Sequence, residues 1–253
     1  MGKVISVSNQ KGGVGKTTTS LSLAASLGVL EKKVLLIDAD PQGNATSGIG
    51  ISNNDFNKSS YDVLLNRCKI HESIIETKSP NLDIIPANID LVAVEIELVD
   101  IANRESMLTK MLEKIKNDYD FIIIDCPPSL GLITMNALTA SNSVIIPIQC
   151  EYYALEGLGK LLNTIKGVQQ VHNEKLEIEG ILLTMFDSRL RLSNQVKDDV
   201  KKHFSDMVFS TIIPRNVSLG EAPSHGESII VYNSTSKGSK SYIKFAQEVI
   251  NLN

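Results

Sequence analysis

The sequence predicts an α/β fold with a doubly wound, mostly parallel sheet flanked by helices. Six short runs rich in Val, Ile and Leu show little polar alternation, which is typical of strands covered on both faces. Helix-like stretches alternate with these runs, as right-handed βαβ crossovers require. The expected strands are residues 4–7, 34–37, 82–85, 121–124, 144–148 and 178–183, and the expected helices are 17–30, 91–101, 106–116, 155–172 and 194–204.

The composition is that of an ordinary globular chain. Of 253 residues, 42% are hydrophobic and 21% are charged, which excludes a disordered or collagen-like chain. Strand and helix signals resume on both sides of the polar stretch 52–60, so we expect a loop there and a single domain over residues 1–253. Cys68, Cys126 and Cys150 lack CxxC spacing and a His cluster, so we expect neither a disulfide framework nor a zinc site, and a reducing cytoplasm fits best.

Charge and hydropathy exclude further classes of protein. The net charge of −4, from 25 basic and 29 acidic residues, argues against a chain that is basic throughout, the simplest signature of nucleic-acid binding. Residues 181–253 nevertheless carry nine basic and seven acidic side chains, so the C-terminal part of the chain is its basic part. The alternative explanation of this small excess is a solvated helix face. No apolar run approaches the ~18 residues of a membrane span, and no leader precedes the first expected strand. We therefore expect neither a membrane-spanning nor a secreted protein.

A glycine-rich segment, SNQKGGVGKTT at residues 8–18, lies between the first expected strand and the first expected helix. Glycines in such a turn let backbone N–H groups surround phosphate oxygens, and the helix adds its positive N-terminal end. Lys16 would then reach the β- and γ-phosphates of a nucleotide, and the Thr17 hydroxyl would bind Mg²⁺. The expected nucleotide-binding residues of the loop are Lys11, Gly12, Gly13, Val14, Gly15, Lys16, Thr17 and Thr18.

Lys11 is the most discriminating residue of this segment. The strict pattern G-x-x-x-x-G-K-[ST] fails because Gln10 stands at its first position, and Lys11 follows. Lys16 already serves the phosphates of its own nucleotide, so a second cation on the outer edge of the loop could reach a nucleotide held by a facing subunit. A two-fold dimer with two ATP molecules in its interface would use Lys11 in this way, much as an arginine finger acts in trans. The alternative is a surface lysine in a flexible turn.

Three carboxylates follow two of the expected strands. Asp38 and Asp40 follow the run 34–37, and Asp125 follows the run 121–124. A carboxylate at the end of a buried strand must face ligand or solvent. Residues i and i+2 share one face of an extended chain, so Asp38 and Asp40 could approach the phosphate loop together. A strand-end cap or a turn former is the alternative for each, and we favour a functional role for Asp40.

Four motifs, in order along the chain, resemble those of the ParA/MinD family of ATPases. The run 11–18 is similar to the deviant Walker A motif of that family. The segments 35–44 and 121–128 also match, and the fourth motif comprises the turn 214–217 and the segment 221–226 that follows it. The similarity covers nearly the whole chain and is greatest to the short chromosomal ParA proteins. It implies a P-loop NTPase-like fold with ATP and Mg²⁺ as cofactors.

The resemblance also implies roles for single residues. Asp40 would position and polarise the attacking water, which makes Lys11, Lys16 and Asp40 the expected catalytic residues. Asp125 would hold Mg²⁺ through its water shell, beside Thr17, with Asp38 as a weaker ligand candidate that supports the site. Pro214 and Asn216, after an expected short strand at 211–213, would flank the adenine, although a P-R-N segment is otherwise often only a turn.

Partners and location also follow from the resemblance. It implies an ATP-dependent homodimer that holds double-stranded DNA non-specifically, a ParB-like activating protein, and a cytoplasmic protein associated with the nucleoid. Arg189 matches a DNA-facing position of the family, whereas Ser218 stands where relatives carry a basic residue, which weakens the expected patch. A solvated helix face is the alternative for these basic residues. The expected DNA-binding residues are Arg189, Arg191, Lys197 and Lys201.

Two other readings remain open. A MinD-like or other polar-positioning ATPase would act at a membrane or a protein scaffold, for which a basic amphipathic C-terminal helix is needed. The apolar residues of 242–250 recur at helical spacing and are expected to face the core, so we expect no membrane partner. A metabolic P-loop enzyme is the other reading, but Cys126 lies too close to Asp125 to match the iron–sulfur cysteine of an electron carrier. With no room before the first strand for a helix-turn-helix domain, operator recognition is not expected.

Overall fold

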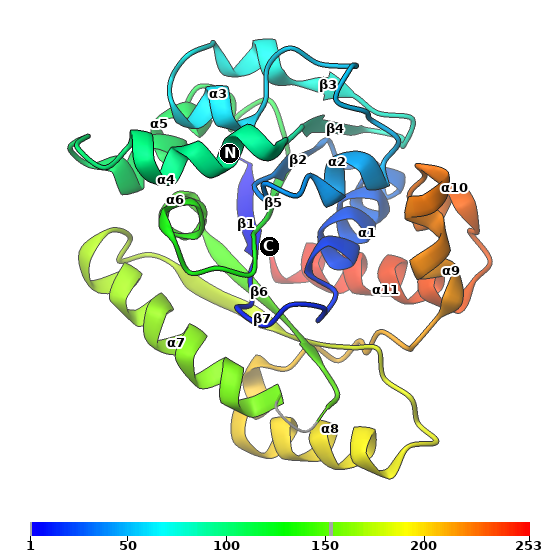
Figure 1. The fold of residues 1–253 in the computed structure, drawn as a ribbon. Helices are drawn as coiled ribbons and strands as arrows, with labels where there is room; N and C mark the ends of the chain where they lie inside the picture. The colour runs from blue at the N-terminus through cyan, green and yellow to red at the C-terminus, as the bar shows by residue number, and fades with distance from the viewer. Residues whose placement is uncertain (1, 152–153) are drawn as a thin grey trace.

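A seven-stranded sheet forms the centre of the protein, seen in Figure 1, a computed structural model that describes residues 2–151 and 154–253. The strands are β1 (Lys3–Val7), β2 (Val34–Asp38), β3 (Ile75–Glu76), β4 (Leu82–Ile85), β5 (Phe121–Asp125), β6 (Ser143–Gln149) and β7 (Glu177–Thr184). Their order in the sheet is β3-β4-β2-β5-β1-β6-β7. All neighbours pair in parallel except β3 and β4. The fold is therefore the expected doubly wound, mostly parallel α/β fold.

Helices cover both faces of this sheet (Figure 1). The α-helices are α1 (Lys16–Val29), α2 (Asn44–Gly48), α3 (Ser60–Leu64), α4 (Val94–Glu97), α5 (Met107–Leu112), α6 (Leu132–Ala140), α7 (Ala154–Val171), α8 (Arg191–Phe204), α9 (Val217–Glu221), α10 (Ile229–Tyr232) and α11 (Lys237–Leu252). Short 3₁₀ turns are η1 (Ile70–Ser73), η2 (Ile89–Ala93), η3 (Arg104–Ser106), η4 (Ser205–Met207) and η5 (Ala222–His225). Among the described residues, no helix has the length and apolar character that a membrane crossing needs.

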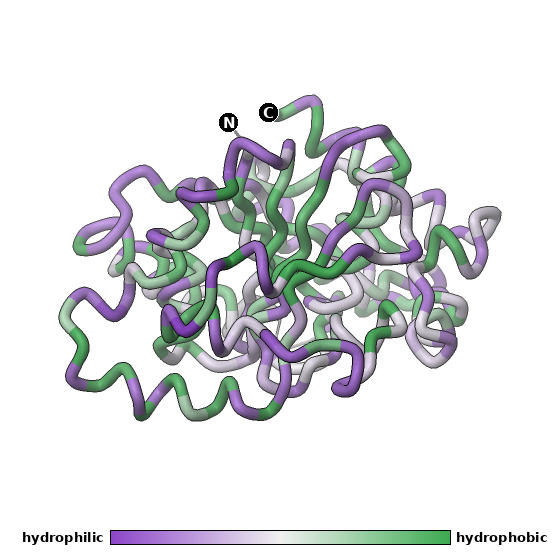
Figure 2. Tube along the Cα trace, turned by 90° about the horizontal axis from the view of Figure 1, so that it is seen from above, coloured by the Kyte–Doolittle hydropathy of each residue, from purple (hydrophilic) through white to green (hydrophobic). Residues whose placement is uncertain are grey.

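The core consists of three apolar clusters. The first lies where α1 and α11 pack on the sheet, and it contains the fully buried Tyr242 and Phe245. The second lies on the other face, under α3, α5 and α6. The third joins α7 and α8 to β6 and β7. Figure 2 shows the same arrangement, with hydrophobic strands in the middle of the molecule and hydrophilic segments toward its edges. Burial on both faces explains the lack of polar alternation along the strands.

The regular elements follow the sequence prediction closely. All six expected strands are confirmed, each within one residue of its predicted ends. Helices 17–30 and 155–172 are confirmed within one residue, and α8 begins three residues before its predicted start at 194. The stripe along 242–250 faces the core, because Tyr242, Phe245, Ala246 and Val249 are buried. The single-domain interpretation stays a prediction, supported by the packing of α11 against α1.

Other predictions were wrong, and the short elements were missed. The expected strand at 211–213 is irregular, and the isolated bridge between Phe186 and Pro214 falls directly after it. The helix expected over 91–101 is broken into η2 and α4, and the helix expected over 106–116 ends at Leu112. The strand β3 has two residues, too few to show a period. In α6 the buried residues include the polar Thr134 and Asn136. No purely apolar face at helical spacing therefore marks this segment as a helix.

Candidate nucleotide-binding site

The glycine-rich loop joins the end of β1 to the start of α1 at the carboxyl edge of the parallel strands. Gly13 and Gly15 have φ angles of 73° and 85°, a left-handed conformation that glycine adopts without strain. Gly15 is the N-cap residue of α1, and no side chain caps that helix. The first N–H groups of α1 therefore lack a side-chain acceptor, which is the arrangement that binds anions at helix N-termini.

Two side chains outside the motif fix this loop to neighbouring strands. Asn9 Nδ2 donates to Pro147 O in β6 at 2.8 Å, and Lys11 N donates to Asn9 Oδ1 at 3.0 Å. Thr184 Oγ1, at the end of β7, donates to Val14 O at 2.8 Å. Sequence reasoning missed Asn9 and Thr184, because no spacing pattern connects Thr184 to a loop 170 residues earlier. The loop conformation is thus held in place by the protein itself.

Lys16 and Asp125 lie at the base of the loop. Lys16 is buried and its Nζ donates to Lys11 O at 3.1 Å. Asp125 is fully buried at the end of β5, and its Oδ1 accepts a hydrogen bond from Ser20 Oγ at 2.8 Å. Its Oδ2 has no hydrogen-bond partner among the described residues. Sequence reasoning also missed Ser20, which lies one helical turn after Lys16.

Burial sets the electrostatics of this pair. It lowers the pKa of Lys16, although the neighbouring Asp125 opposes the shift. Burial raises the pKa of Asp125, and the charge of Asp38 raises it further. Burial thus deprives the charged forms of both side chains of solvation by water. A nucleotide phosphate and a hydrated cation would supply partners to both, and the unpartnered Asp125 Oδ2 fits a water-mediated Mg²⁺ contact.

Asp38 and Asp40 are brought together as expected, but Asp38 is occupied by internal contacts. Asp38 Oδ1 accepts from Asp40 N at 3.1 Å, and its Oδ2 accepts from Thr46 N at 2.8 Å and from Thr46 Oγ1 at 2.7 Å. Burial raises the pKa of Asp38, and the Thr46 hydroxyl opposes the shift. This geometry favours a supporting role for Asp38 over direct metal binding. The catalytic role of Asp40 stays a prediction; its Oδ1 accepts from Gln42 N at 3.0 Å.

Pro214 and Asn216 lie beside the loop, although they follow it by about 200 residues. A cavity of about 200 Å³ separates them from Gly15 and Thr18, and its other walls include Met185 and Tyr242. Asn216 Oδ1 is buried and has no hydrogen-bond partner among the described residues. A buried polar oxygen without a partner costs about 1–3 kcal/mol, so an N–H donor on a ligand would stabilise it. An adenine amino group is such a donor.

Lys11 lies on the outer side of the loop and contacts a residue of its own chain. Its Nζ lies 3.6 Å from Glu151 Oε2, and the two side chains are 32% and 52% exposed. Gln149 Nε2 also donates to Glu151, at 2.6 Å. Glu151 is thus a further residue of the site that the motifs did not indicate. The predicted contact of Lys11 with a second protomer stays a prediction.

The four basic residues expected to bind DNA lie at or near α8, and their environments differ. Arg189 is 85% exposed at its side chain, but Asp187 neutralises it through hydrogen bonds of 2.9 and 2.6 Å. The Arg189 hydrogen bonds lower the pKa of Asp187 to about 2. Lys197 lies over the Phe186 ring and 3.4 Å from Asp198. Arg191 and Lys201 are exposed. Their contact with DNA stays a prediction.

The chain is similar to known proteins in both sequence and structure. The family profile described as an AAA domain matches residues 2–178. The chain is 57% identical to the sporulation initiation inhibitor protein Soj of Bacillus subtilis, over 98% of each chain. It is 52% identical to the chromosome partitioning protein ParA of Myxococcus xanthus, over 99% of this chain and 88% of the relative. Among solved structures, the chain is similar to the crystal structure of cobyrinic acid a,c-diamide synthase from Mycobacterium smegmatis with a bound ATP analogue and magnesium. The two are 38% identical and superpose with a TM-score of 0.87, over 99% of this chain and 95% of the synthase chain.

Proposed function

The chain belongs to the ParA/MinD family of ATPases, and from this premise we propose that it is an ATP-dependent chromosome-partitioning ATPase. ATP and Mg²⁺ are its cofactors, and ATP hydrolysis is its reaction. In the proposal, ATP joins two protomers into a dimer that holds DNA non-specifically, and partner-stimulated hydrolysis releases it. Its place of action would be the nucleoid in the cytoplasm.

The observation that carries the proposal is the arrangement at the carboxyl edge of the sheet. The uncapped N-terminus of α1, the buried Lys16 and the unpartnered Asp125 Oδ2 lie around one loop. The α1 amides and Lys16 would bind the phosphates, and Thr17 and Asp125 would hold hydrated Mg²⁺. The cation, when bound, neutralises charge that develops on the transferred phosphoryl group. Asn216 and Pro214 would bind the base in the adjoining cavity.

DNA binding depends on dimerisation in this proposal. Two of the four basic residues expected to bind DNA are compensated within each protomer, because Asp187 neutralises Arg189 and Asp198 lies beside Lys197. One such patch binds DNA weakly, whereas two patches on one dimer gain from their high effective concentration. ATP thereby controls the affinity for DNA. We expect this affinity to fall with salt, at a log–log slope of about −0.9 for each phosphate neutralised.

Slow hydrolysis without a partner is part of the proposal. The two lysines of the loop, Lys11 and Lys16, are both assigned to phosphate contacts. A further group from a ParB-like partner would then be needed to stabilise the transition-state charge, as an arginine finger does elsewhere. The dimer would persist on DNA until that partner arrives.

The proposal is tested with Asp40→Ala. The variant should bind ATP, hydrolyse little of it, and stay dimeric on DNA, because it keeps the phosphate loop and lacks the residue that positions water. Asp118→Ala, an exposed carboxylate elsewhere on the chain, is the matched control. Light scattering and DNA retention with ATP give the readouts. A monomeric Asp40→Ala in ATP would refute the assigned role.

Two other functions give different outcomes. A MinD-like protein would float with liposomes in ATP and would not be retained on DNA. The name of the synthase structure at 38% identity favours a metabolic ligase as a second candidate, which would form ADP only when a carboxylate acceptor and an amine donor are both supplied. The partitioning function is preferred because relatives of higher identity than the synthase, at 52% and 50%, carry that name.

A further inference from the structure

Gly238 is a buried glycine in the first turn of α11, at a position where the backbone does not require glycine. Its φ angle lies outside the left-handed region. The start of α11 is defined by Ser236, whose Oγ accepts a hydrogen bond from Ser239 N at 3.0 Å. Within a helix, alanine is generally more stable than glycine. The conformation of α11 therefore gives no reason for glycine here.

Close packing against the start of α9 gives that reason. A Cβ atom added to Gly238 would lie 2.9 Å from Asn216 Oδ1 and 2.7 Å from Leu219 Cγ. Non-bonded carbon atoms pack best at about 3.5–4.0 Å, so both distances are too short for a side chain at this position. Any other residue at 238 would have to displace Asn216, Leu219 or the whole of α9.

Both of these neighbours belong to the base cavity, whereas Gly238 does not line it. Asn216 and Leu219 are among the lining residues of the cavity of about 200 Å³ beside Gly15. Asn216 is also the N-cap residue of α9, and Leu219 lies within that helix. Gly238 can therefore influence a bound base only by way of the residues that it contacts.

The same part of α11 is fixed to the helix that begins at the phosphate loop. Tyr242, one helical turn after Gly238, lines the base cavity, and its hydroxyl shares a hydrogen bond of 3.0 Å with Thr19 Oγ1 in α1. Both side chains are buried. The packing of α11 therefore fixes the wall of the base cavity relative to the residues expected to bind the phosphates.

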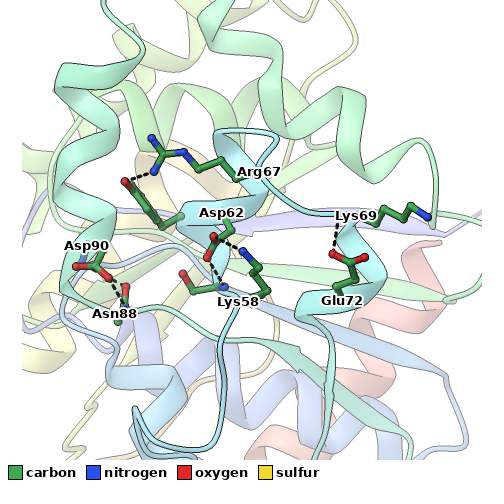
Figure 3. A network of polar contacts seen from close by, with 9 residues as sticks. Lys58, Asp62, Arg67, Lys69, Glu72, Asn88 and Asp90 are labelled. Atoms are coloured by element: carbon green, nitrogen blue, oxygen red, sulfur yellow. Dashed lines mark hydrogen bonds and ion pairs between the residues drawn. The ribbon is translucent and has the colours of Figure 1, made fainter.

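The Asn216 amide oxygen that faces Gly238 is buried and has no hydrogen-bond partner among the described residues. Polar side chains elsewhere are paired even where water could reach them. Beside α3, for example, the partly exposed Lys58 donates to Asp62 Oδ1 at 3.1 Å (Figure 3). Because Gly238 has no side chain, it brings no side-chain donor to the oxygen, and Asn216 keeps its hydrogen-bonding capacity for a ligand.

We propose that Gly238 is a positioning residue for the nucleobase: the absence of a side chain at 238 sets the positions of the Asn216 amide and of Leu219 in the base cavity. This inference rests on the proposed function, since it needs an adenine nucleotide in that cavity. The competing explanation is that Gly238 only allows α9 to pack on α11. In that case a substitution would lower stability without acting selectively on the nucleoside part of the ligand.

The test is Gly238→Ala in the full-length protein, with the affinities for ATP and for inorganic tripolyphosphate measured by calorimetry in Mg²⁺. ATP should bind about tenfold more weakly, the effect of one lost buried hydrogen bond, and tripolyphosphate should bind as before. The ratio of the two affinities should therefore fall about tenfold. Gly167→Ala in α7 is the matched control, because a Cβ there meets no heavy atom outside its own helix within 4 Å among the described residues. It should leave both affinities unchanged.

A second pair of variants covers the case in which Gly238→Ala does not fold. Leu219→Ala removes the contact of 2.7 Å, so Gly238→Ala/Leu219→Ala retains only the contact of 2.9 Å with Asn216. The double variant should have a lower ratio of ATP to tripolyphosphate affinity than Leu219→Ala alone. An unchanged ratio in folded Gly238→Ala, or equal ratios in the second pair, overturns the inference.

The two levels of the argument fail in different ways. Wild-type protein that binds ATP and forms ATP-dependent dimers, with an unchanged affinity ratio in Gly238→Ala, rejects the role of Gly238 alone. Wild-type protein that binds neither ATP nor tripolyphosphate rejects the proposed function as well.

Discussion

The ion pair of Lys11 with Glu151 predicts how readily the protein exchanges an internal contact for one with a second protomer. The two charges lie 3.6 Å apart, and the side chains are 32% and 52% exposed. Ion pairs as exposed as this one contribute about 0–1 kcal/mol, because water and salt screen them and the long side chains lose freedom. Glu151 therefore competes only weakly with the triphosphate of a bound ATP for contact with Lys11.

Glu151→Gln removes the competing charge and keeps the shape of the side chain. We expect the ATP-dependent dimer to tighten by at most about thirtyfold, since a two-fold dimer contains two such pairs and about 1 kcal/mol for each corresponds to about fivefold in an equilibrium constant. Lys11→Ala should bind ATP and stay monomeric. In the Lys11→Ala background, Glu151→Gln should have no effect, because its partner is already missing.

The assay is sedimentation of each variant over a concentration series with a non-hydrolysable ATP analogue, with ATP affinity measured separately by calorimetry. Lys3→Ala, which removes a lysine paired with Glu179 away from the loop, is the control. An unchanged dimer in Lys11→Ala would refute the trans-lysine argument. A large tightening by Glu151→Gln that survives in the double variant would show that Glu151 acts on something other than Lys11.

Three further predictions concern the phosphates, the base and DNA. Lys16→Ala should abolish nucleotide binding or productive dimerisation; normal ATP-dependent dimers in light scattering would contradict this. Asn216→Ala should weaken ATP by about tenfold or less, the cost of one buried hydrogen bond, and should leave triphosphate affinity unchanged in calorimetry. Asp187→Asn should raise DNA affinity and steepen the salt slope by about 0.9, because it frees Arg189 for one more phosphate. The pKa of Asp187 is lowered to about 2 by Arg189, so its carboxylate stays charged above its unfolded pKa of about 3.9 and is neutralised only near pH 2. The gain from Asp187→Asn should therefore be constant between about pH 5 and 8, and a gain that vanished toward pH 5 would contradict the assignment.

The long elements of the fold were predictable because their sequence signals are local. Strands such as β5 are buried on both faces, so their apolar runs coincide with the elements themselves. The segment 91–101 misled the prediction for a related reason. It has apolar residues on an inner and an outer face, which suggests one long helix, whereas it forms a 3₁₀ turn, one turn of α-helix and a loop. Composition cannot tell a buried apolar face from an exposed one.

The site was predictable where it depends on backbone geometry and not where it depends on distant contacts. Glycines at 13 and 15 and the lysine after them specify the loop within a few residues. Thr184, Glu151 and Ser20 reach the same site from other elements, and single polar residues at those positions have no distinguishing pattern. The resemblance led to Asn216, but only the structure brings this residue to the cavity that Gly15 and Thr18 also line.

Thr46 connects three parts of the chain through one side chain. Its hydroxyl donates to Asp38 Oδ2 at 2.7 Å and accepts from Ala87 N at 2.9 Å, while Asp38 Oδ1 holds the amide of Asp40. The Asp40 loop is therefore held by hydrogen bonds within its own chain, which lowers the entropy cost of ordering it for the reaction. The lifetime of the ATP-bound dimer then depends on how often the activating partner binds it. A cell could therefore set the time of release from DNA by where it concentrates that partner.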